Sequence, residues 1–188
     1  ISWVDPGPAL ADMGLEAYAR QGVLEAFAAA TRATERPELL AAGYCNGGTL
    51  LAVALALAAG EGGHPIRAAT FLTTLLDYGD PGAPGVFVDA ETIPLIEAAV
   101  ARSGRLDAAD LEHAFALLKA DDVIWPAFVR TFLLGQPPPA SDVLFWNAHG
   151  VGVPAALARD LLQCLYRDNR LVAPDGLRLG GAIAAPSS

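Results

Sequence analysis

The spacing of apolar residues predicts helices and strands that alternate along the first part of the chain. Residues 15–34 carry large apolar side chains at helical intervals, and residues 46–59 are an almost continuous run of apolar residues. Two shorter apolar runs, residues 39–44 and 68–76, flank the second helix and have the length of buried strands. A strand, a helix and a second strand in this order predict a parallel pair, so the sequence indicates the α/β class.

The pattern becomes less regular after residue 78, where a segment rich in glycine and proline begins. Helices are expected over residues 91–103 and 107–120, with Asp107 as the N-cap of the second helix. Because proline lacks a backbone N–H, the pair Trp125–Pro126 is expected to break the segment that follows.

Three further elements are expected in the last part of the sequence. Residues 143–147 have the apolar character of a short strand, residues 154–170 that of a helix, and the glycine-rich residues 176–183 that of a hairpin. Cys164 belongs to the apolar face of that helix and is expected in the core.

One cysteine lies between the first predicted strand and the helix that follows it. The sequence Gly43-x-Cys45-x-Gly47 has the spacing of the nucleophile elbow of α/β-hydrolase folds, with cysteine in the place of serine. At such an elbow the nucleophile has a strained backbone, so the residues two positions away must lack a Cβ. The helix would direct its amides and its positive dipole end at Cys45, which favours the thiolate, and the Asn46 amide would donate to an oxyanion.

Cys45 also has a simpler interpretation. A cysteine in an apolar sequence is more often a small buried hydrophobe than a nucleophile, and this short pattern is common by chance. The surrounding elements favour the nucleophile, since a strand precedes Cys45, a helix begins directly after it and a second strand follows.

These elements predict a partial α/β-hydrolase fold, a mostly parallel sheet with flanking helices and an inserted cap. Residues 1–78 would form the core with the elbow, residues 79–140 the cap, and residues 141–188 the return to the core. The sequence opens on residues 1–4 of extended character, followed by Asp5 in a turn. The fold is therefore expected to be incomplete at both ends.

Composition and charge exclude several classes of protein. With 53% hydrophobic and 18% charged residues, the chain has the composition of a folded domain. A net charge of −9 without a basic cluster argues against nucleic acid as a partner. The apolar run over residues 49–60 is too short to span a bilayer. Two cysteines in different contexts and the lack of a secretory signal indicate a reduced, cytoplasmic setting, and no metal or nucleotide motif is present, so neither kind of cofactor is expected.

Six stretches of the chain together resemble the polyhydroxyalkanoate synthases, in particular those that polymerise short-chain hydroxyacyl-CoA. They occur in the family's order and at similar spacing, over residues 1–3, 43–49, 72–78, 86–89, 144–147 and 166–169. The resemblance implies an acyltransferase that extends a polyester from (R)-3-hydroxyacyl-CoA, expected to be 3-hydroxybutyryl-CoA, with Cys45 carrying the chain as a thioester. The CoA thioester is then the substrate, and no separate cofactor is implied. The resemblance further implies a homodimer formed through the cap region around Trp125, and a place at the surface of polymer granules.

The resemblance also implies a histidine that activates the thiol and an aspartate that assists it. In the family both follow the equivalent of residues 176–183, in a region that this sequence does not contain. The sequence is therefore expected to be an internal fragment that is inactive by itself.

The three histidines of the chain are less suited to the role of base. His64 lies in a glycine-rich loop and His113 on a predicted helix, where solvent-exposed positions are expected. Cys45, Asp77 and His149 occur in the nucleophile, acid, base order of α/β hydrolases, which leaves an alternative triad open. Asp77 is otherwise expected to hold a loop near the mouth of the site.

Two other functions remain open on the sequence. A cysteine-elbow esterase, thioesterase or depolymerase would use water to release the acyl group from the enzyme. A catalytically silent relative would only bind polymer granules or a synthase partner through an apolar cap.

Overall fold

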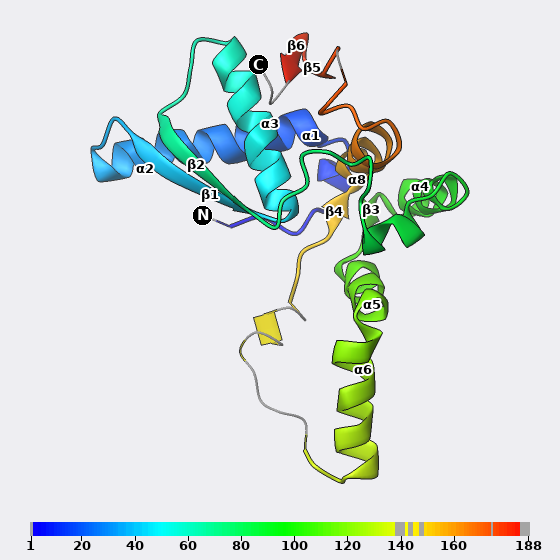
Figure 1. The fold of residues 1–188 in the computed structure, drawn as a ribbon. Helices are drawn as coiled ribbons and strands as arrows, with labels where there is room; N and C mark the ends of the chain where they lie inside the picture. The colour runs from blue at the N-terminus through cyan, green and yellow to red at the C-terminus, as the bar shows by residue number, and fades with distance from the viewer. Residues whose placement is uncertain (1, 138–141, 143–144, 147–148, 174, 185–188) are drawn as a thin grey trace.

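The computed structural model describes residues 2–137, 142, 145–146, 149–173 and 175–184. It is a mixed fold of helices and short strands, which is compatible with the α/β class expected from the sequence (Figure 1). The boundaries of the core, the cap and the return segment stay predictions.

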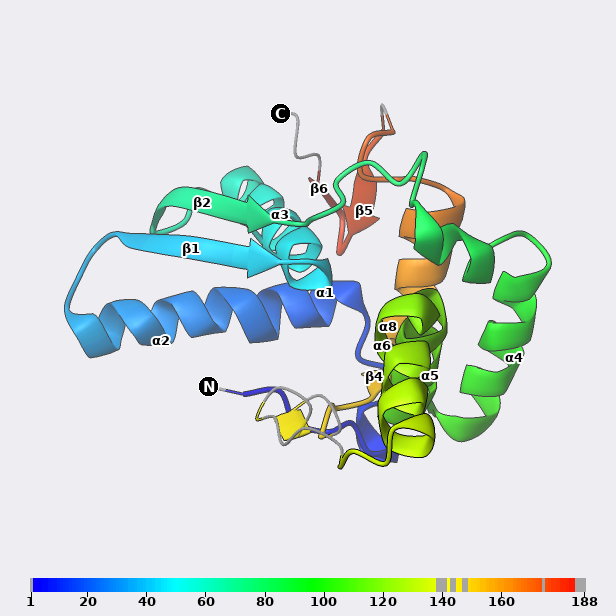
Figure 2. The same cartoon turned by 60° about the horizontal axis from the view of Figure 1, so that its bottom comes forward.

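The predicted strand, helix and strand form a parallel unit, as expected. β1 (Leu39–Tyr44) and β2 (Ile66–Leu72) pair in parallel, with Gly43 opposite Phe71, and α3 (Asn46–Gly60) connects them. Figure 2 shows the two strands beside α3 and the long N-terminal helix. α3 packs directly against both β1 and the π-helical part of that long helix. Residues of β1 alternate between partly covered and exposed, so the helices cover one face of the pair.

α3 lies at the centre of the core, which explains why its sequence is apolar on every side. Val53, Ala54 and Leu57 are completely buried. A helix without a polar face must be covered all round, and here both ends of the described chain supply the cover. The other buried residues of this core are Leu15, Ala19, Tyr78, Leu157, Leu165, Leu171, Leu177 and Ala184.

The helix predicted over residues 15–34 is confirmed as one continuous element. It consists of α1 (Leu15–Ala17), a π-helical segment (Tyr18–Leu24) and α2 (Glu25–Thr34). Leu15 N, at its start, donates to the Asp160 carboxylate over 2.8 Å. A residue from a distant part of the sequence therefore supplies the acceptor that the first helical turn needs.

The remaining elements complete the body of the molecule and form an arm that projects from it (Figure 1). The arm is α5 (Ala108–Leu118), α6 (Ala120–Phe128) and a π-helical segment (Val129–Leu133). β3 (Arg105–Leu106) pairs antiparallel with β4 (Val153–Pro154), and β5 (Leu177–Leu179) with β6 (Ala182–Ala184). The predicted hairpin is thus confirmed, together with the three predicted helices after residue 90. The other elements described outside the arm are two 3-10 helices (Pro8–Leu10 and Ala83–Phe87), α4 (Thr92–Ser103), α8 (Ala155–Asp160) and a π-helical segment (Leu161–Arg167).

The second strand ends earlier than predicted. β2 ends at Leu72, because Thr73 adopts a left-handed backbone with φ +45° and the Thr74 hydroxyl donates to Leu72 O over 3.1 Å. A local bond of this kind competes with the sheet and turns the chain. Asp77 consequently lies in the loop beyond the strand, and the expectation that the strand extends to residue 76 was wrong.

The prediction that Pro126 breaks a helix was also wrong. Pro126 lies inside α6, which continues into the π-helical segment of the arm. Trp125 packs against Phe128, and Phe128 against Phe132, with ring centroids 6.2 and 5.2 Å apart. Proline removes one backbone hydrogen-bond donor from the helix. The aromatic contacts before and after Pro126 stabilise the helix in spite of this loss.

Arg105 forms ion pairs with Asp5 and Asp107, which the sequence predicted in a turn and at a helix N-cap. Asp107 occupies the N-cap position of α5, but its carboxylate pairs with Arg105 Nε at 2.6 Å and does not cap the helix. Asp5 lies 3.0 Å from Arg105 Nη1 and accepts a bond from Gly152 N over 2.9 Å. The Gly152 amide and the arginine hold the pKa of Asp5 below its ordinary value. Asp5 thus fastens the N-terminal segment to the β3–β4 pair.

The strand expected over residues 143–147 is not observed where the structure describes this segment. Phe145 and Trp146 are helical, and residues 143, 144 and 147 lie outside the described residues. The His149 ring stacks on Phe145 at 4.2 Å, and its Nδ1 lies 2.7 Å from Phe145 O. Contacts between residues four apart are typical of a helical turn, which a short apolar run does not distinguish from a strand.

Candidate functional site

Cys45 forms the whole connection between β1 and α3. It adopts φ +53° and ψ −130°, a backbone conformation that costs roughly 1–3 kcal/mol for a residue with a side chain. Cys45 N donates to Leu72 O over 3.0 Å, and Cys45 O accepts bonds from Gly48 N and Thr49 N at 2.9 and 3.3 Å. Backbone bonds contribute about 1 kcal/mol each, so these bonds are together of the size needed to hold the strained turn.

The Cys45 side chain is exposed to solvent, so the interpretation of this residue as a small buried hydrophobe was wrong. Asn46 and Gly47 supply the first two amides of α3, for which a helix offers no carbonyl of a preceding turn. Within the described chain neither amide donates to another residue. The role of Asn46 as an oxyanion donor stays a prediction.

The glycines that the turn requires are not quite the predicted pair. A Cβ placed on Gly43 would overlap the backbone of Gly48, and a Cβ on Gly48 would overlap the Thr74 side chain. A Cβ on Gly47 would meet nothing within 4 Å. The close approach of β1 to α3 thus depends on Gly43, and the close approach of the loop after β2 to α3 depends on Gly48. The expectation that Gly47 must lack a side chain was wrong.

A network of hydrogen bonds lies next to the strained turn. The Thr49 hydroxyl, in the first turn of α3, is 2.8 Å from Leu75 O and 3.1 Å from the Tyr78 hydroxyl. Tyr78 N donates to Asn169 Oδ1 over 2.8 Å, and Asn169 Nδ2 donates to Asp77 Oδ1 over 2.7 Å. The network therefore joins α3, the loop after β2 and the residues that follow the C-terminal helix.

Two tyrosines pack together in this region. The rings of Tyr78 and Tyr166 meet edge to face, with centroids 4.8 Å apart. Burial raises the pKa of Tyr78, and burial with smaller contributions from Tyr78 and Cys45 raises the pKa of Tyr166 to about 12. Both phenols consequently keep their protons at neutral pH, and Tyr78 can act as a hydrogen-bond donor.

Asp77 holds the loop after β2, as one of the two expectations for it stated. Its Oδ1 accepts bonds from Gly79 N over 2.9 Å and from Asn169 Nδ2 over 2.7 Å. These two donors hold the pKa of Asp77 below its ordinary value, so the carboxylate stays charged at neutral pH.

The structure does not assemble the alternative triad of Cys45, Asp77 and His149. His149 is exposed and is engaged with Phe145, four residues earlier. His64 and His113 are exposed as well, the first in a loop and the second on α5. Among the described residues no hydrogen bond joins a histidine to Cys45 or to Asp77.

The comparisons with known proteins identify the family to which this turn belongs. The chain is 43% identical over 171 residues to the poly(3-hydroxyalkanoate) polymerase subunit PhaC of Rhizobium meliloti, an alignment that covers 91% of the chain and 28% of that protein. It is 41% identical to the poly(3-hydroxyalkanoate) polymerase of Methylorubrum extorquens over the same shares. The chain is a homologue of part of the poly(3-hydroxyalkanoate) polymerases. The polymerase subunit PhaC of Cupriavidus necator is 32% identical over 96% of the chain and 32% of its own length.

The chain thus spans about a third or less of the polymerases that it matches. No family model matches it. The resemblance stated from the short stretches above is confirmed over nearly the whole chain.

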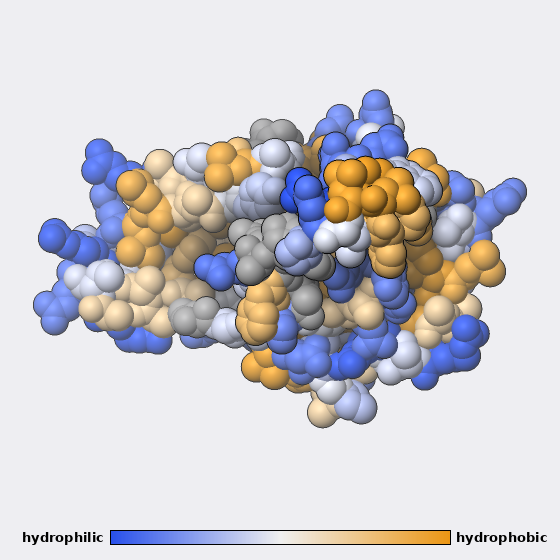
Figure 3. Space-filling view, turned by 90° about the horizontal axis from the view of Figure 1, so that it is seen from below, coloured by the Kyte–Doolittle hydropathy of each residue, from blue (hydrophilic) through white to orange (hydrophobic). Residues whose placement is uncertain are grey.

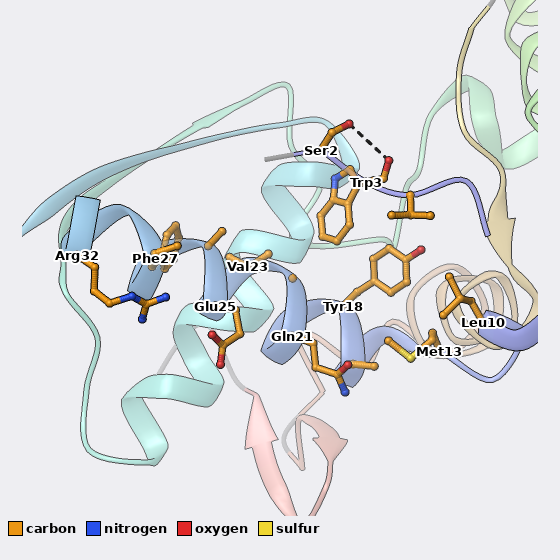
Figure 4. A pocket seen from close by; sticks show the side chains of 15 residues that line it. Ser2, Trp3, Leu10, Met13, Tyr18, Gln21, Val23, Glu25, Phe27 and Arg32 are labelled. Atoms are coloured by element: carbon orange, nitrogen blue, oxygen red, sulfur yellow. Dashed lines mark hydrogen bonds between the residues drawn. The ribbon is translucent and has the colours of Figure 1, made fainter. Parts of the chain in front are cut away.

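A groove on the described part of the chain lies away from Cys45. It has a volume of about 810 Å³ and runs between the N-terminal segment and the long helix, where the Trp3 ring stacks on Tyr18 at 4.9 Å (Figure 4). Cys45 does not line this groove. In the described ranges no three His, Cys, Asp or Glu side chains gather closely enough to hold a metal ion, and no described helix is long and apolar enough to cross a membrane.

Cys164 lies where the sequence placed it. It packs against the core and is only partly accessible. Burial raises the pKa of the Cys164 thiol, which makes it a weaker nucleophile than an accessible cysteine at neutral pH.

Sequence reasoning missed the roles of Thr49, Tyr78 and Asn169. Tyr78 and Asn169 belong to stretches that resemble the polymerases, but 91 residues separate the two bonded partners, so no local pattern joins them. Thr49 has the sequence context of an ordinary residue in an apolar helix, and only its position in the fold gives its hydroxyl two partners.

The contrast between Gly48 and Gly47 gives a direct test of the packing at the turn. We expect Gly48→Ala to lower the free energy of unfolding by about 1–3 kcal/mol, because Thr74 must move, whereas Gly47→Ala should be neutral or stabilising by up to about 1 kcal/mol. Urea denaturation of both variants measures the difference. Adding Thr74→Ala to Gly48→Ala should recover part of the loss, and equal effects at the two glycines would contradict this account.

Proposed function

We propose that Cys45 is the acyl acceptor of a poly(3-hydroxyalkanoate) polymerase. One observation supports this most strongly: an exposed cysteine occupies a strained turn between a parallel strand and a helix, in a chain homologous to these polymerases. Strain of this kind is typical of functional sites, where the rest of the structure holds a reactive group in place.

The proposed framework is part of an α/β-hydrolase fold. A parallel strand, a tight turn at the nucleophile and a following helix are the core elements of that fold. The outer edges of β1 and β2 have no partner strand among the described residues, and Leu40 and Tyr44 are 79% and 69% exposed. Two parallel strands are too few for a stable sheet, so we propose that other parts of the longer polymerase supply the neighbouring strands.

The proposed chemistry begins with thioester exchange. The Cys45 thiolate attacks the carbonyl carbon of a hydroxyacyl-CoA, a bond from Cys45 Sγ to that carbon forms, and CoA leaves as its thiolate and takes up a proton. We propose that the amide of Asn46, the first residue of α3, stabilises the negative charge on the carbonyl oxygen during this step. One thioester replaces another, so little free energy is lost before the hydroxyl of the next acyl group attacks and extends the polyester.

The base for this reaction is proposed to lie outside the 188 residues. The three histidines of the chain are exposed, and none is bonded to Cys45 among the described residues. The polymerases that the chain matches are about three times as long, and we expect a histidine and an aspartate from the remainder to complete the site. The 188-residue chain alone should then show no turnover.

Replacement of Cys45 tests the proposed role. In the full-length polymerase that contains this chain, Cys45→Ala should abolish polymer formation from (R)-3-hydroxybutyryl-CoA, and Cys45→Ser should reduce it by at least about a hundredfold, because an alcohol is a far weaker nucleophile than a thiolate at neutral pH. Polymer yield and release of free CoA measure both effects.

Cys164→Ser is the matched control, since this partly buried cysteine packs in the core, and it should leave the rate unchanged. Full activity of Cys45→Ala would contradict the proposal. Two results with the wild-type protein would favour the other functions. Release of free hydroxy acid without polymer would favour the esterase or thioesterase alternative, and absence of any acyl transfer would favour the silent granule-binding relative.

We further propose that the arm mediates a homodimer of the cytoplasmic polymerase at the surface of polymer granules. Its aromatic side chains point outward, and Phe132 is 74% exposed. Figure 3 shows apolar side chains gathered where the arm faces the viewer. Exposed apolar patches on a protein surface often mark contacts with a partner. The exposed apolar residues of the arm are Phe115, Leu117, Ile124, Trp125, Phe128, Val129, Phe132 and Leu133.

Light scattering of arm variants tests the dimer. Phe128→Ser combined with Phe132→Ser should weaken dimerisation of the full-length protein by at least about tenfold, because aromatic residues dominate the binding energy of such contacts. Val172→Ser removes an exposed apolar side chain outside the arm and should leave the dimer intact. A dimer that is equally stable in both variants would contradict the proposed interface.

A further inference from the structure

Two hydroxyl groups are buried together beside the Cys45 turn. Thr49 is 1% exposed and Tyr78 is 2% exposed, and their oxygens are 3.1 Å apart. Burying a hydroxyl without a partner costs about 1–3 kcal/mol, so a pair at this depth is retained only where both groups are satisfied.

The direction of each bond follows from the number of protons. The Thr49 hydroxyl has one proton, and Leu75 O, 2.8 Å away, can only accept. Thr49 therefore donates to Leu75, and the Tyr78 hydroxyl must be the donor in the bond to Thr49. The two bonds together join the first turn of α3 to the loop after β2.

Thr49 also contacts Cys45 through a backbone hydrogen bond. Thr49 N donates to Cys45 O over 3.3 Å, and Cys45 N is held on the other side by Leu72 O over 3.0 Å. The loop that carries Leu75 and Tyr78 begins directly after Leu72. A shift of Thr49 relative to this loop would therefore move the two backbone contacts of Cys45 apart.

A second set of contacts fixes Tyr78 from its backbone side. Tyr78 N donates to the Asn169 side chain, which in turn donates to the charged Asp77. The Tyr166 ring packs edge to face against the Tyr78 ring. Tyr78 is therefore held through its backbone, its ring and its hydroxyl, and the hydroxyl is directed at Thr49.

We propose that Thr49 and Tyr78 are positioning residues for Cys45: their hydroxyl bonds lock the first turn of α3 against the loop after β2 and so keep the sulfur in its strained, exposed position. The inference deepens the proposed function, since it concerns the same reactive cysteine, but it makes a statement about thiol reactivity that does not require polymer synthesis.

The alkylation rate of Cys45 tests this inference. The full-length polymerase that contains the chain is treated with iodoacetamide, and the Cys45 peptide is quantified by mass spectrometry over time. Thr49→Val keeps the shape of the side chain and removes both hydroxyl bonds, so it should slow alkylation about three- to tenfold, the equivalent of one hydrogen bond. Tyr78→Phe removes one bond and should slow alkylation by a smaller factor.

Thr49→Ser separates positioning from stability. Serine loses the methyl group and should lower the melting temperature, but it keeps the hydroxyl and should restore the alkylation rate to within about twofold of wild type. Thr31→Val and Tyr18→Phe are matched controls, because the Thr31 hydroxyl bonds only within its own helix and Tyr18 lies in the groove near Trp3. Neither control should change the rate.

Two results would overturn the inference. One is a Thr49→Val variant with a lower melting temperature and an unchanged rate of Cys45 alkylation, and the other is a Thr49→Ser variant as slow as Thr49→Val. If Thr49→Val does not fold, Tyr78→Phe, which keeps the bond from Thr49 to Leu75, decides the question by the same criterion. A different result would contradict the proposed function alone. In that case the variants change the alkylation rate as expected, but the wild-type protein transfers no acyl group to Cys45.

Discussion

The structure depends on the conformation of one residue, Cys45, which must turn the chain from a strand into a helix without a connecting loop. The turn places the backbone in a region that a residue with a side chain avoids, at a cost of roughly 1–3 kcal/mol. The bond that Cys45 N donates to Leu72 O and the two bonds that Cys45 O accepts from Gly48 N and Thr49 N offset a cost of this size. The turn that strains the backbone is also the turn on which the sulfur is exposed.

The surrounding packing makes this conformation possible. A Cβ on Gly43 would force β1 and α3 apart, and a Cβ on Gly48 would displace Thr74 in the loop after β2. α3 itself is fixed by burial on nearly all sides. Much of this cover comes from residues beyond position 150, which also contribute Asn169 to the network beside Tyr78. The geometry of the cysteine therefore depends on distant parts of the fold as well as on the local motif.

The parts of the fold that could be predicted from the sequence are those set by local periodicity and local chemistry. The parallel strand–helix–strand unit, the long N-terminal helix and the C-terminal hairpin follow from apolar spacing and glycine positions, and the turn at Cys45 follows from its glycines and its place between two elements. The errors arose where side chains decide the outcome. Thr74 ends β2 early, aromatic contacts carry a helix through Pro126, Arg105 draws Asp107 away from its cap, and Thr74 makes Gly48 the required glycine in place of Gly47. The bonds of Thr49, Tyr78 and Asn169 join residues far apart in the sequence, and no periodicity encodes them.

The most direct test of the central claim is the relative rate at which iodoacetamide labels the two cysteines of the folded protein at neutral pH. Cys45 is exposed on its turn, whereas burial lowers access to Cys164 and raises the pKa of its thiol, and each unit of pKa changes the thiolate fraction about tenfold. The account predicts that Cys45 is labelled at least about tenfold faster than Cys164, and that this difference disappears in denaturant. Equal, slow labelling of both cysteines in the folded protein would contradict it.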